Sequence, residues 1–378
     1  MMIKMVDLYN QYLSISNEIN HAINEVITKS AFIKGSAVEL FEEELSQFLN
    51  VKHCITCGNG TDAILLSLMA IGLKQGDEVI MPAFSFAAVA EAVILLGGVP
   101  VFADVDPYTF NISTASVTRL ISSQTKAIIP VHLFGQPCEM IELIKIAEKY
   151  GLMVIEDNAQ SLGAECYMEN GTNKYAGTIG HIGCTSFFPS KVLGCFGDGG
   201  AVFTNDNILA ERIRALANHG QISKYKHQFV GLNSRLDTIQ AAILRVKLPY
   251  LKQWIASRRR AAHYYTSELN QLPSVEVPVE FPHGSHVYHQ YTIKVTPDNR
   301  DGLKTTFEKA GIASMIYYPM PLFKQPAYCN RCICDPMMFN SENLSTSVLS
   351  LPMHSELTEL QQDAVIATIR HYFTNNQH

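Results

Sequence analysis

A single lysine follows an apolar run in the stretch CTSFFPSKVLGCFGDGGAVFTN, which covers residues 184–205. Lys191 has small and apolar neighbours, and no acidic residue follows it before Asp198. Because burial disfavours the charged form of an amine, such a lysine either extends its amine to solvent or is used chemically. A desolvated amine has a lowered pKa and attacks carbonyl groups. The stretch therefore predicts an amine that condenses with an aldehyde.

Three further groups of residues could assist that chemistry. Asp157 ends the apolar run in VIEDNAQS, where a carboxylate can bind a ligand or cap the next turn. Gly60 and Thr61 in CGNGTDAILL open a predicted helix whose free N–H groups suit a phosphate, although Thr61 as an N-cap is also ordinary helix initiation. Ser186 offers a hydroxyl to the same phosphate. Phe86 could stack on a planar ring, whereas a phenylalanine in a core is commonplace.

Pyridoxal phosphate requires these parts together. Its aldehyde needs a lysine, its ring nitrogen needs a carboxylate, its phosphate needs a donor-rich cradle, and an aromatic side chain holds its ring. The chain supplies all four in an order that one sheet can bring together. The sequence therefore predicts this cofactor from the combination of Lys191, Asp157, Gly60, Thr61, Ser186 and Phe86.

Composition excludes several classes of function. The 378 residues are 47% hydrophobic and 17% charged, and the formal net charge of -6 gives no basic footprint for nucleic acid or an anionic membrane. No apolar leader opens the sequence, and apolar stretches such as 87–96 are too short to span a bilayer. Most of the nine cysteines lie in apolar segments, which suits reduced thiols. We expect a cytoplasmic protein without membrane or nucleic-acid partners.

One cluster of cysteines could suggest a metal. Cys329, Cys332 and Cys334 lie close together in YCNRCICD. A metal site would need a fourth ligand, and the spacing does not match a paired C-x-x-C zinc pattern. We therefore expect incidental loop cysteines and no metal.

The elements that must position these residues alternate regularly from residue 53 to about 218. Short strand-like runs, such as 126–133 and 184–188, alternate with helical segments, which predicts a mainly parallel, doubly wound α/β sheet. A long helix is expected over 235–254, and VYHQYTIKV at 287–295 is typical of a strand in a smaller α+β lobe. We expect an N-terminal helical segment (1–35) that packs with the small domain, a large domain (36–250) and a small C-terminal domain (251–378).

Several long motifs carry a resemblance to a known family. They are GNGTDAI, PAFSFAAVAEA, VIEDNAQSLGA, TSFFPSK, GDGGAVFTN, GLNSRLDTIQAAIL, HVYHQYTI and LPMH. Together they cover nearly the whole chain, which resembles the DegT/DnrJ/EryC1/StrS family of PLP-dependent nucleotide-sugar aminotransferases. The resemblance implies the type I fold of aspartate aminotransferase and a large domain that binds pyridoxal phosphate.

The resemblance also implies roles for individual residues. Lys191 would bind the cofactor aldehyde covalently, Asp157 would pair with its ring nitrogen, and Gln160 would lie near the ring. Phe86 would stack on the ring, while Gly60, Thr61 and Ser186 would bind the phosphate. Asn233 would reach the phosphate from a neighbouring subunit, which implies a homodimer with shared active sites; a turn residue is its ordinary interpretation. The residues expected around the sugar nucleotide are Arg235, Tyr317, Tyr318 and His354.

Lys191 also favours one reaction among relatives of this kind. Family members that dehydrate sugars carry a histidine at the lysine position, so the lysine implies transamination from L-glutamate, with 2-oxoglutarate as product. The motifs are similar to those of enzymes acting at C3 of UDP-linked 2-acetamido-3-keto sugars, while dTDP-6-deoxyhexoses share much of the pattern. Tyr317 stands where glucuronate enzymes often have histidine. Amino transfer at C4 and a non-catalytic regulator with the same fold are the alternatives. Lipopolysaccharide or O-antigen synthesis is the expected pathway.

Overall fold

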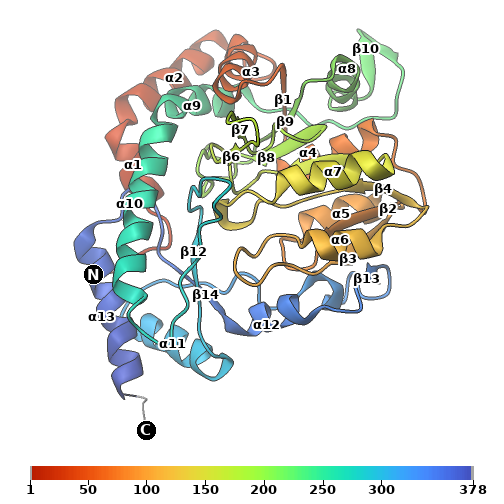
Figure 1. Ribbon diagram of the computed structural model, residues 1–378. Helices are drawn as coiled ribbons and strands as arrows, with labels where there is room; N and C mark the ends of the chain where they lie inside the picture. The colour runs from red at the N-terminus through yellow and green to blue at the C-terminus, as the bar shows by residue number, and fades with distance from the viewer. Residues whose placement is uncertain (1, 376–378) are drawn as a thin grey trace.

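The centre of the molecule is an eight-stranded sheet in the computed structural model, which describes residues 2–375 (Figure 1). The strands from β8 to β13 in the sheet pair in parallel, and β9 runs antiparallel between β1 and β8. The mainly parallel sheet that the sequence predicted is confirmed. The strands in spatial order are β1 (His53–Cys57), β9 (Gly200–Thr204), β8 (Ile182–Ser186), β5 (Met153–Asp157), β4 (Thr125–Ile128), β2 (Glu78–Pro82), β3 (Val99–Ala103) and β13 (Ile333–Cys334).

Helices cover both faces of this sheet because its strands are apolar on both sides. Successive strand residues point to opposite faces, so Val79 and Met81 join one core while Ile80 joins the other. The first core includes α4 (Gly60–Ala70), α5 (Ala88–Leu95) and α8 (Asn207–Leu216). The second includes α3 (Ser36–Leu49), α6 (Thr114–Leu120), α7 (Met140–Tyr150) and α9 (Thr238–Lys247).

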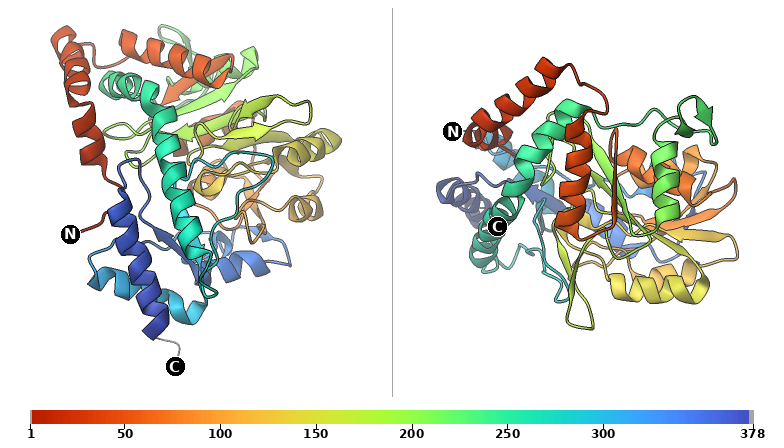
Figure 2. Two further views of the ribbon diagram at one scale, coloured as in Figure 1. Left: turned by 60° about the vertical axis from the view of Figure 1, so that its left-hand side comes forward. Right: turned by 90° about the horizontal axis from the view of Figure 1, so that it is seen from above.

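A third core lies around a two-stranded antiparallel sheet near the C-terminal end of the chain. Tyr291 and Leu351 pair across this sheet and are both buried. The long helix α10 and the last helix α13 run side by side along it (Figure 2). The elements of this region are α10 (Leu251–Leu269), β12 (Tyr291–Lys294), α11 (Pro297–Lys309), α12 (Phe339–Ser347), β14 (Val348–Leu351) and α13 (Glu359–Asn375).

The N-terminal segment contacts two regions. Ile3 belongs to the third core and forms a bridge to Ile312. After α1 (Leu8–Ser14), the helix α2 (Ser16–Lys29) packs its buried Ile19 with Ile243 and Trp254. Two short hairpins complete the fold, β6 (Glu165–Tyr167) with β7 (Asn173–Tyr175) and β10 (Gln221–Ser223) with β11 (Lys226–His227). The expected domain boundaries at residues 35 and 250 stay predictions.

Some element boundaries differ from the expected ones for local reasons. The helix expected over 235–254 is divided into α9 and α10 by a 3-10 turn, Leu248–Tyr250, which contains Pro249. Proline has no N–H to continue the helical hydrogen bonds. The strand expected over 126–133 ends at Ile128, two residues before Pro130.

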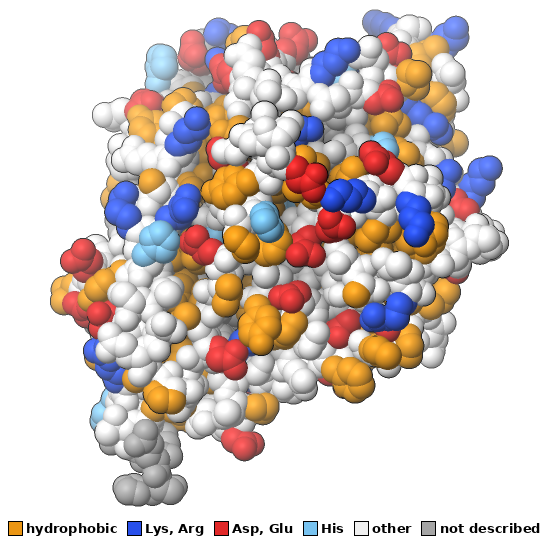
Figure 3. Space-filling view, in the orientation of Figure 1, with side chains coloured by type: hydrophobic (Ala, Val, Ile, Leu, Met, Phe, Trp, Pro, Cys, Tyr) orange, Lys and Arg blue, Asp and Glu red, His pale blue; other side chains and the backbone are white. Residues whose placement is uncertain are grey.

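Basic and acidic side chains are interspersed on the face drawn in Figure 3. Within residues 2–375, none of the helices is long and apolar enough to cross a bilayer.

Candidate active site

The predicted site residues converge where β5 and β8 end. These two strands are parallel neighbours, with Asp157 paired to Cys184, so their carboxyl ends lie at one edge of the sheet. Ligands of open α/β sheets bind at this edge. Ser186 ends β8 there, and the first turn of α4 packs directly against it through Gly60.

Asp157 presents a buried carboxylate at this edge. The residue is only 6% exposed, and its Oδ1 accepts a hydrogen bond of 3.0 Å from the backbone N–H of Ala159. Burial raises the pKa of Asp157, while the positive charge of Lys191 and the imidazole of His132 act to lower it. No donor within residues 2–375 occupies Oδ2, so this oxygen is free to pair with a protonated ring nitrogen.

Lys191 lies within electrostatic reach of Asp157. Burial lowers the pKa of Lys191 to about 8, and the charge of Asp157 opposes that shift. The lysine remains partly accessible, and its backbone N–H donates to the carbonyl of Phe188 at 2.9 Å, in the turn that follows β8. In the described part of the chain, Nζ has no hydrogen-bond acceptor. The amine is therefore available for reaction with a carbonyl.

The start of α4 forms a tight cradle beside Ser186. A Cβ atom on Gly60 would lie 2.7 Å from Cβ of Ser186, so only glycine fits without displacement. Asn59 is the N-cap, because its side chain accepts a 2.8 Å hydrogen bond from the N–H of Asp62. The alternative interpretation of Thr61 as the N-cap is therefore wrong, since the N-cap lies two residues earlier. The first N–H groups of α4 point from a positive helix end toward the sheet edge.

An aromatic cluster borders the same region. Phe84 is fully buried, whereas Phe86 is 58% exposed and its ring lies 6.5 Å from that of Tyr318. Gln160 donates from Nε2 to Tyr318 Oη at 3.1 Å and accepts the N–H of Phe134 at 2.7 Å. Two phenylalanines that are two residues apart and have a similar sequence context thus have different surroundings. Only Phe86 has a free face that a planar ring could use.

The predicted residues that remain do not all lie at this edge of the sheet. Asn233 is exposed, while its neighbour Ser234 is buried and accepts a 2.9 Å hydrogen bond from the N–H of Gly58. Arg235 lines a separate cavity with Lys34 and Arg214. Tyr317 is half-buried beside Tyr318, with ring centroids 5.8 Å apart, and His354 is buried after β14.

Sequence reasoning missed two histidines. His132 Nε2 lies 2.8 Å from Oε2 of Glu156, and both side chains are completely buried. Glu156 also accepts backbone hydrogen bonds from residues 177, 179 and 180, so it holds the loop before β8 while Asp157 points to the other face. The second histidine is His289, whose pKa is lowered by burial and by the charge of Lys191. The motif HVYHQYTI contained His289, but nothing in the sequence separated it from its neighbours.

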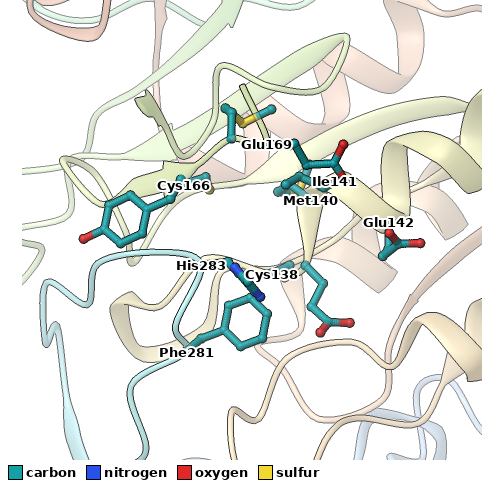
Figure 4. A pocket seen from close by; sticks show the side chains of 11 residues that line it. Cys138, Met140, Ile141, Glu142, Cys166, Glu169, Phe281 and His283 are labelled. Atoms are coloured by element: carbon teal, nitrogen blue, oxygen red, sulfur yellow. The ribbon is translucent and has the colours of Figure 1, made fainter. Parts of the chain in front are cut away.

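The pocket drawn in Figure 4 lies elsewhere. This cavity of about 370 Å³ is lined by Cys138, Met140, Cys166, Phe281 and His283 among others, and it contains none of the predicted site residues. Within residues 2–375 no group of three or more potential metal ligands occurs, and Cys332 and Cys334 bring their sulfurs only to 3.8 Å.

The residues at the sheet edge fit pyridoxal phosphate. Gly60 leaves no room for a side chain beside Ser186, one oxygen of Asp157 is free, and Lys191 Nζ lacks an acceptor among the described residues. A phosphate, a protonated ring nitrogen and an aldehyde are the three groups that such partners suit.

Comparison with known proteins gives relatives of nearly full length, three of which are described here. A model of the DegT/DnrJ/EryC1/StrS aminotransferase family matches residues 13–370. A UDP-2-acetamido-2-deoxy-3-oxo-D-glucuronate aminotransferase of Pseudomonas aeruginosa is 44% identical over 94% of this chain and 96% of its own. A UDP-N-acetyl-3-dehydro-alpha-D-glucosamine 3-aminotransferase of Acidithiobacillus ferrooxidans is 44% identical, over 97% and 96%. A pleiotropic regulatory protein of Geobacillus stearothermophilus is also 44% identical, over 99% of both chains.

Solved structures agree with this comparison. An aminotransferase of the same family from Brucella abortus has a TM-score of 0.92 and 41% identity, covering 98% of this chain and 99% of its own. A Bacillus subtilis protein, NtdA, solved with the bound cofactor PMP, has a TM-score of 0.87 and 34% identity over 96% and 82%. The fold of this chain is therefore that of type I PLP-dependent enzymes.

Proposed function

Because the chain belongs to the DegT/DnrJ/EryC1/StrS aminotransferase family, we propose that it transfers the amino group of L-glutamate to C3 of a nucleotide-linked 3-keto sugar, with pyridoxal phosphate as cofactor. The observation that carries this proposal is the desolvated amine of Lys191 within electrostatic reach of the buried Asp157. A UDP-linked 2-acetamido sugar is favoured, since two relatives at 44% identity are named for such substrates. A transaminase of Streptomyces venezuelae named for a dTDP sugar is 35% identical, which keeps the dTDP option.

The chain's residues divide the work as follows. When bound, the cofactor supplies an electron sink for breaking a bond at the carbon that carries nitrogen. Asp157 Oδ2 would hold the ring nitrogen protonated, while the N-terminus of α4 and Ser186 would bind the phosphate. Lys191 Nζ would act as general base toward the proton on the donor carbon and then as general acid that delivers it to the carbon on the other side of the transferred nitrogen, roles that a pKa of about 8 suits near neutral pH.

The stacking and orienting roles belong to the aromatic cluster. Phe86 would cover one face of the ring, and Gln160, held by Tyr318 and the backbone of Phe134, would border the site. Tyr317, Tyr318, Arg235 and His354 are assigned to the sugar nucleotide.

Asn233 supports a homodimer with shared sites. Its side chain is exposed in the isolated chain, as an arm that enters a neighbour's site should be. A cytoplasmic location is supported by nine free cysteines, six of them buried. A product that enters lipopolysaccharide or O-antigen completes the proposal.

A regulator without catalysis is the second candidate, because one relative at 44% identity is named as a pleiotropic regulatory protein. The two candidates differ in what glutamate does. An enzyme releases 2-oxoglutarate and changes the absorbance of its bound cofactor, whereas a regulator binds the cofactor and leaves glutamate intact.

The test is a panel of nucleotide sugars supplied with glutamate and analysed by mass. UDP- and dTDP-linked 3-keto sugars, with and without a C6 carboxylate, are compared with 4-keto sugars. We expect an amino product from a UDP-linked 2-acetamido-3-keto sugar and equimolar 2-oxoglutarate. Conversion of 4-keto sugars alone would move the reaction to C4, and no conversion of any sugar or of glutamate would leave the regulator.

A further inference from the structure

A buried guanidinium beside the active site lacks an acidic partner. Arg258 on α10 is 3% exposed, and Nη1 donates to the backbone carbonyls of Tyr288, His289 and Met353 at 3.2, 3.4 and 3.1 Å. Within residues 2–375 no carboxylate forms an ion pair with it, and burial lowers the pKa of Arg258 to about 10. Buried charges in proteins are normally paired, because desolvation is costly.

Two buried imidazoles flank this cation. His289 is 8% exposed and His354 is 3% exposed. Among the described residues, Nδ1 of each ring has no hydrogen-bond partner. Burial, and then the charge of Arg258, lower the pKa of His354 to about 4. Buried polar atoms without partners are rare in proteins, so two of them beside one unpaired cation point to a ligand.

Of the three side chains, His289 lies within electrostatic reach of the reactive amine. The charge of Lys191 contributes to the lowered pKa of His289, after burial and before Arg258. The loop that carries His289 is tightly packed against Gly135, because a Cβ atom on Gly135 would lie 2.8 Å from the backbone nitrogen of His289. Asp7 is the acidic group that acts on His354, but its carboxylate is already bonded to Lys4 at 3.3 Å and to Asn10 at 2.6 Å.

We propose that Arg258, His289 and His354 form a carboxylate-binding site for the substrate that reacts at Lys191. This inference rests on the proposed function. A carboxylate supplies the missing negative charge to Arg258 and accepts an N–H from each imidazole, and charge-assisted hydrogen bonds of this kind are strong. Two sources share this chemistry: the carboxylate of the amino donor, and the C6 carboxylate of a uronate sugar.

The experiment compares three half-reactions of the cofactor-loaded protein, each followed by cofactor absorbance. The first uses glutamate, the second a UDP-linked 3-amino sugar with a C6 carboxylate, and the third the same sugar with a C6 hydroxyl. Arg258→Met is compared with Arg260→Met, a matched control on the same helix whose exposed side chain reaches Ser257. Binding of glutarate is measured by calorimetry as a readout independent of turnover.

If the amino donor uses the site, Arg258→Met raises the half-saturating glutamate concentration by about 10- to 100-fold, which is the loss of a charge-assisted hydrogen bond. The half-saturating concentration of the hydroxyl sugar rises at least about tenfold less than that of glutamate. The affinity for glutarate falls in parallel with the affinity for glutamate. If the uronate alone is weakened, the carboxylate belongs to the sugar. Equal losses in all three reactions, or no loss, would overturn the proposal in favour of a structural arginine.

A second variant covers the case in which Arg258→Met does not fold. His354→Phe keeps an aromatic ring and removes the unpartnered nitrogen, and it should show the same selective loss. A wild-type protein that reacts with neither glutamate nor amino sugar would instead refute the proposed function, whatever Arg258 does.

Discussion

The reactivity of Lys191 toward an amine reagent should rise around pH 8 in the cofactor-free protein. Burial lowers the pKa of this amine to about 8, against about 10.4 for an exposed lysine. At pH 7 roughly a tenth of the Lys191 amines are then neutral, compared with about 0.04% of exposed ones, a difference of about 250-fold. Because only the neutral amine is nucleophilic, that ratio is the upper limit of the kinetic advantage that burial gives to Lys191, since an amine of lower pKa is also intrinsically less nucleophilic.

The charge of Asp157 predicts the direction in which the pKa of Lys191 changes when that carboxylate is removed. Its negative charge raises the pKa of Lys191, so Asp157→Asn should move the reactivity profile to lower pH. The reverse shift, or no shift, would show that the carboxylate lies too far from the amine to matter.

The assay labels the apoprotein with trinitrobenzenesulfonate between pH 5.5 and 11 and quantifies each modified lysine by mass. The charge of this reagent does not change over that range, so the profile reports the amine alone. Exposed Lys52 serves as an internal reference in the same digest. A Lys191 profile centred near pH 10.4 would refute the argument from burial, even if the protein binds the cofactor.

Three further predictions concern the cofactor site. Gly60→Ala should weaken cofactor binding by about tenfold or more in a fluorescence titration, because its Cβ would lie 2.7 Å from Ser186; unchanged affinity would exclude the cradle. Asp157→Asn should lower the rate of the glutamate half-reaction in stopped flow by about 10²- to 10³-fold while the cofactor stays bound. Asn233→Ala and Lys191→Ala should each be inactive, yet mixed dimers refolded together should regain about a quarter of wild-type activity, since half the dimers are mixed and one of their two sites is intact. Activity that does not return would contradict a shared site.

The sequence predicted what depends on order and local type. Strand-end positions of Asp157 and Ser186 followed from apolar runs, and the parallel sheet followed from alternation, so the meeting of residues far apart in the chain was predictable. The difference between Phe84 and Phe86 was not predictable, since both have the same local context. Tyr318 contacts both rings, and only Phe84 also packs against Phe110 and Phe134, which come from distant parts of the sequence. Arg258 was equally hidden. Its three carbonyl partners come from segments 30 or more residues away, and a basic helix surface is the ordinary interpretation of RRR.

Two lysines of this protein show why a lowered pKa does not identify a nucleophile. Burial lowers the pKa of Lys247 to about 8, as it does for Lys191. Lys247 Nζ, however, donates to the carbonyl of Gly194 at 2.5 Å and lies over the rings of Phe196 and Trp254. The amine of Lys247 is therefore occupied by a carbonyl and two rings, and it holds the turn that follows Lys191. Lys191 differs because its amine has no acceptor among residues 2–375 and lies within electrostatic reach of a carboxylate with one oxygen free. Reactivity therefore depends on whether the buried amine is free of protein acceptors. The lowered pKa alone is a consequence of burial, which both lysines share.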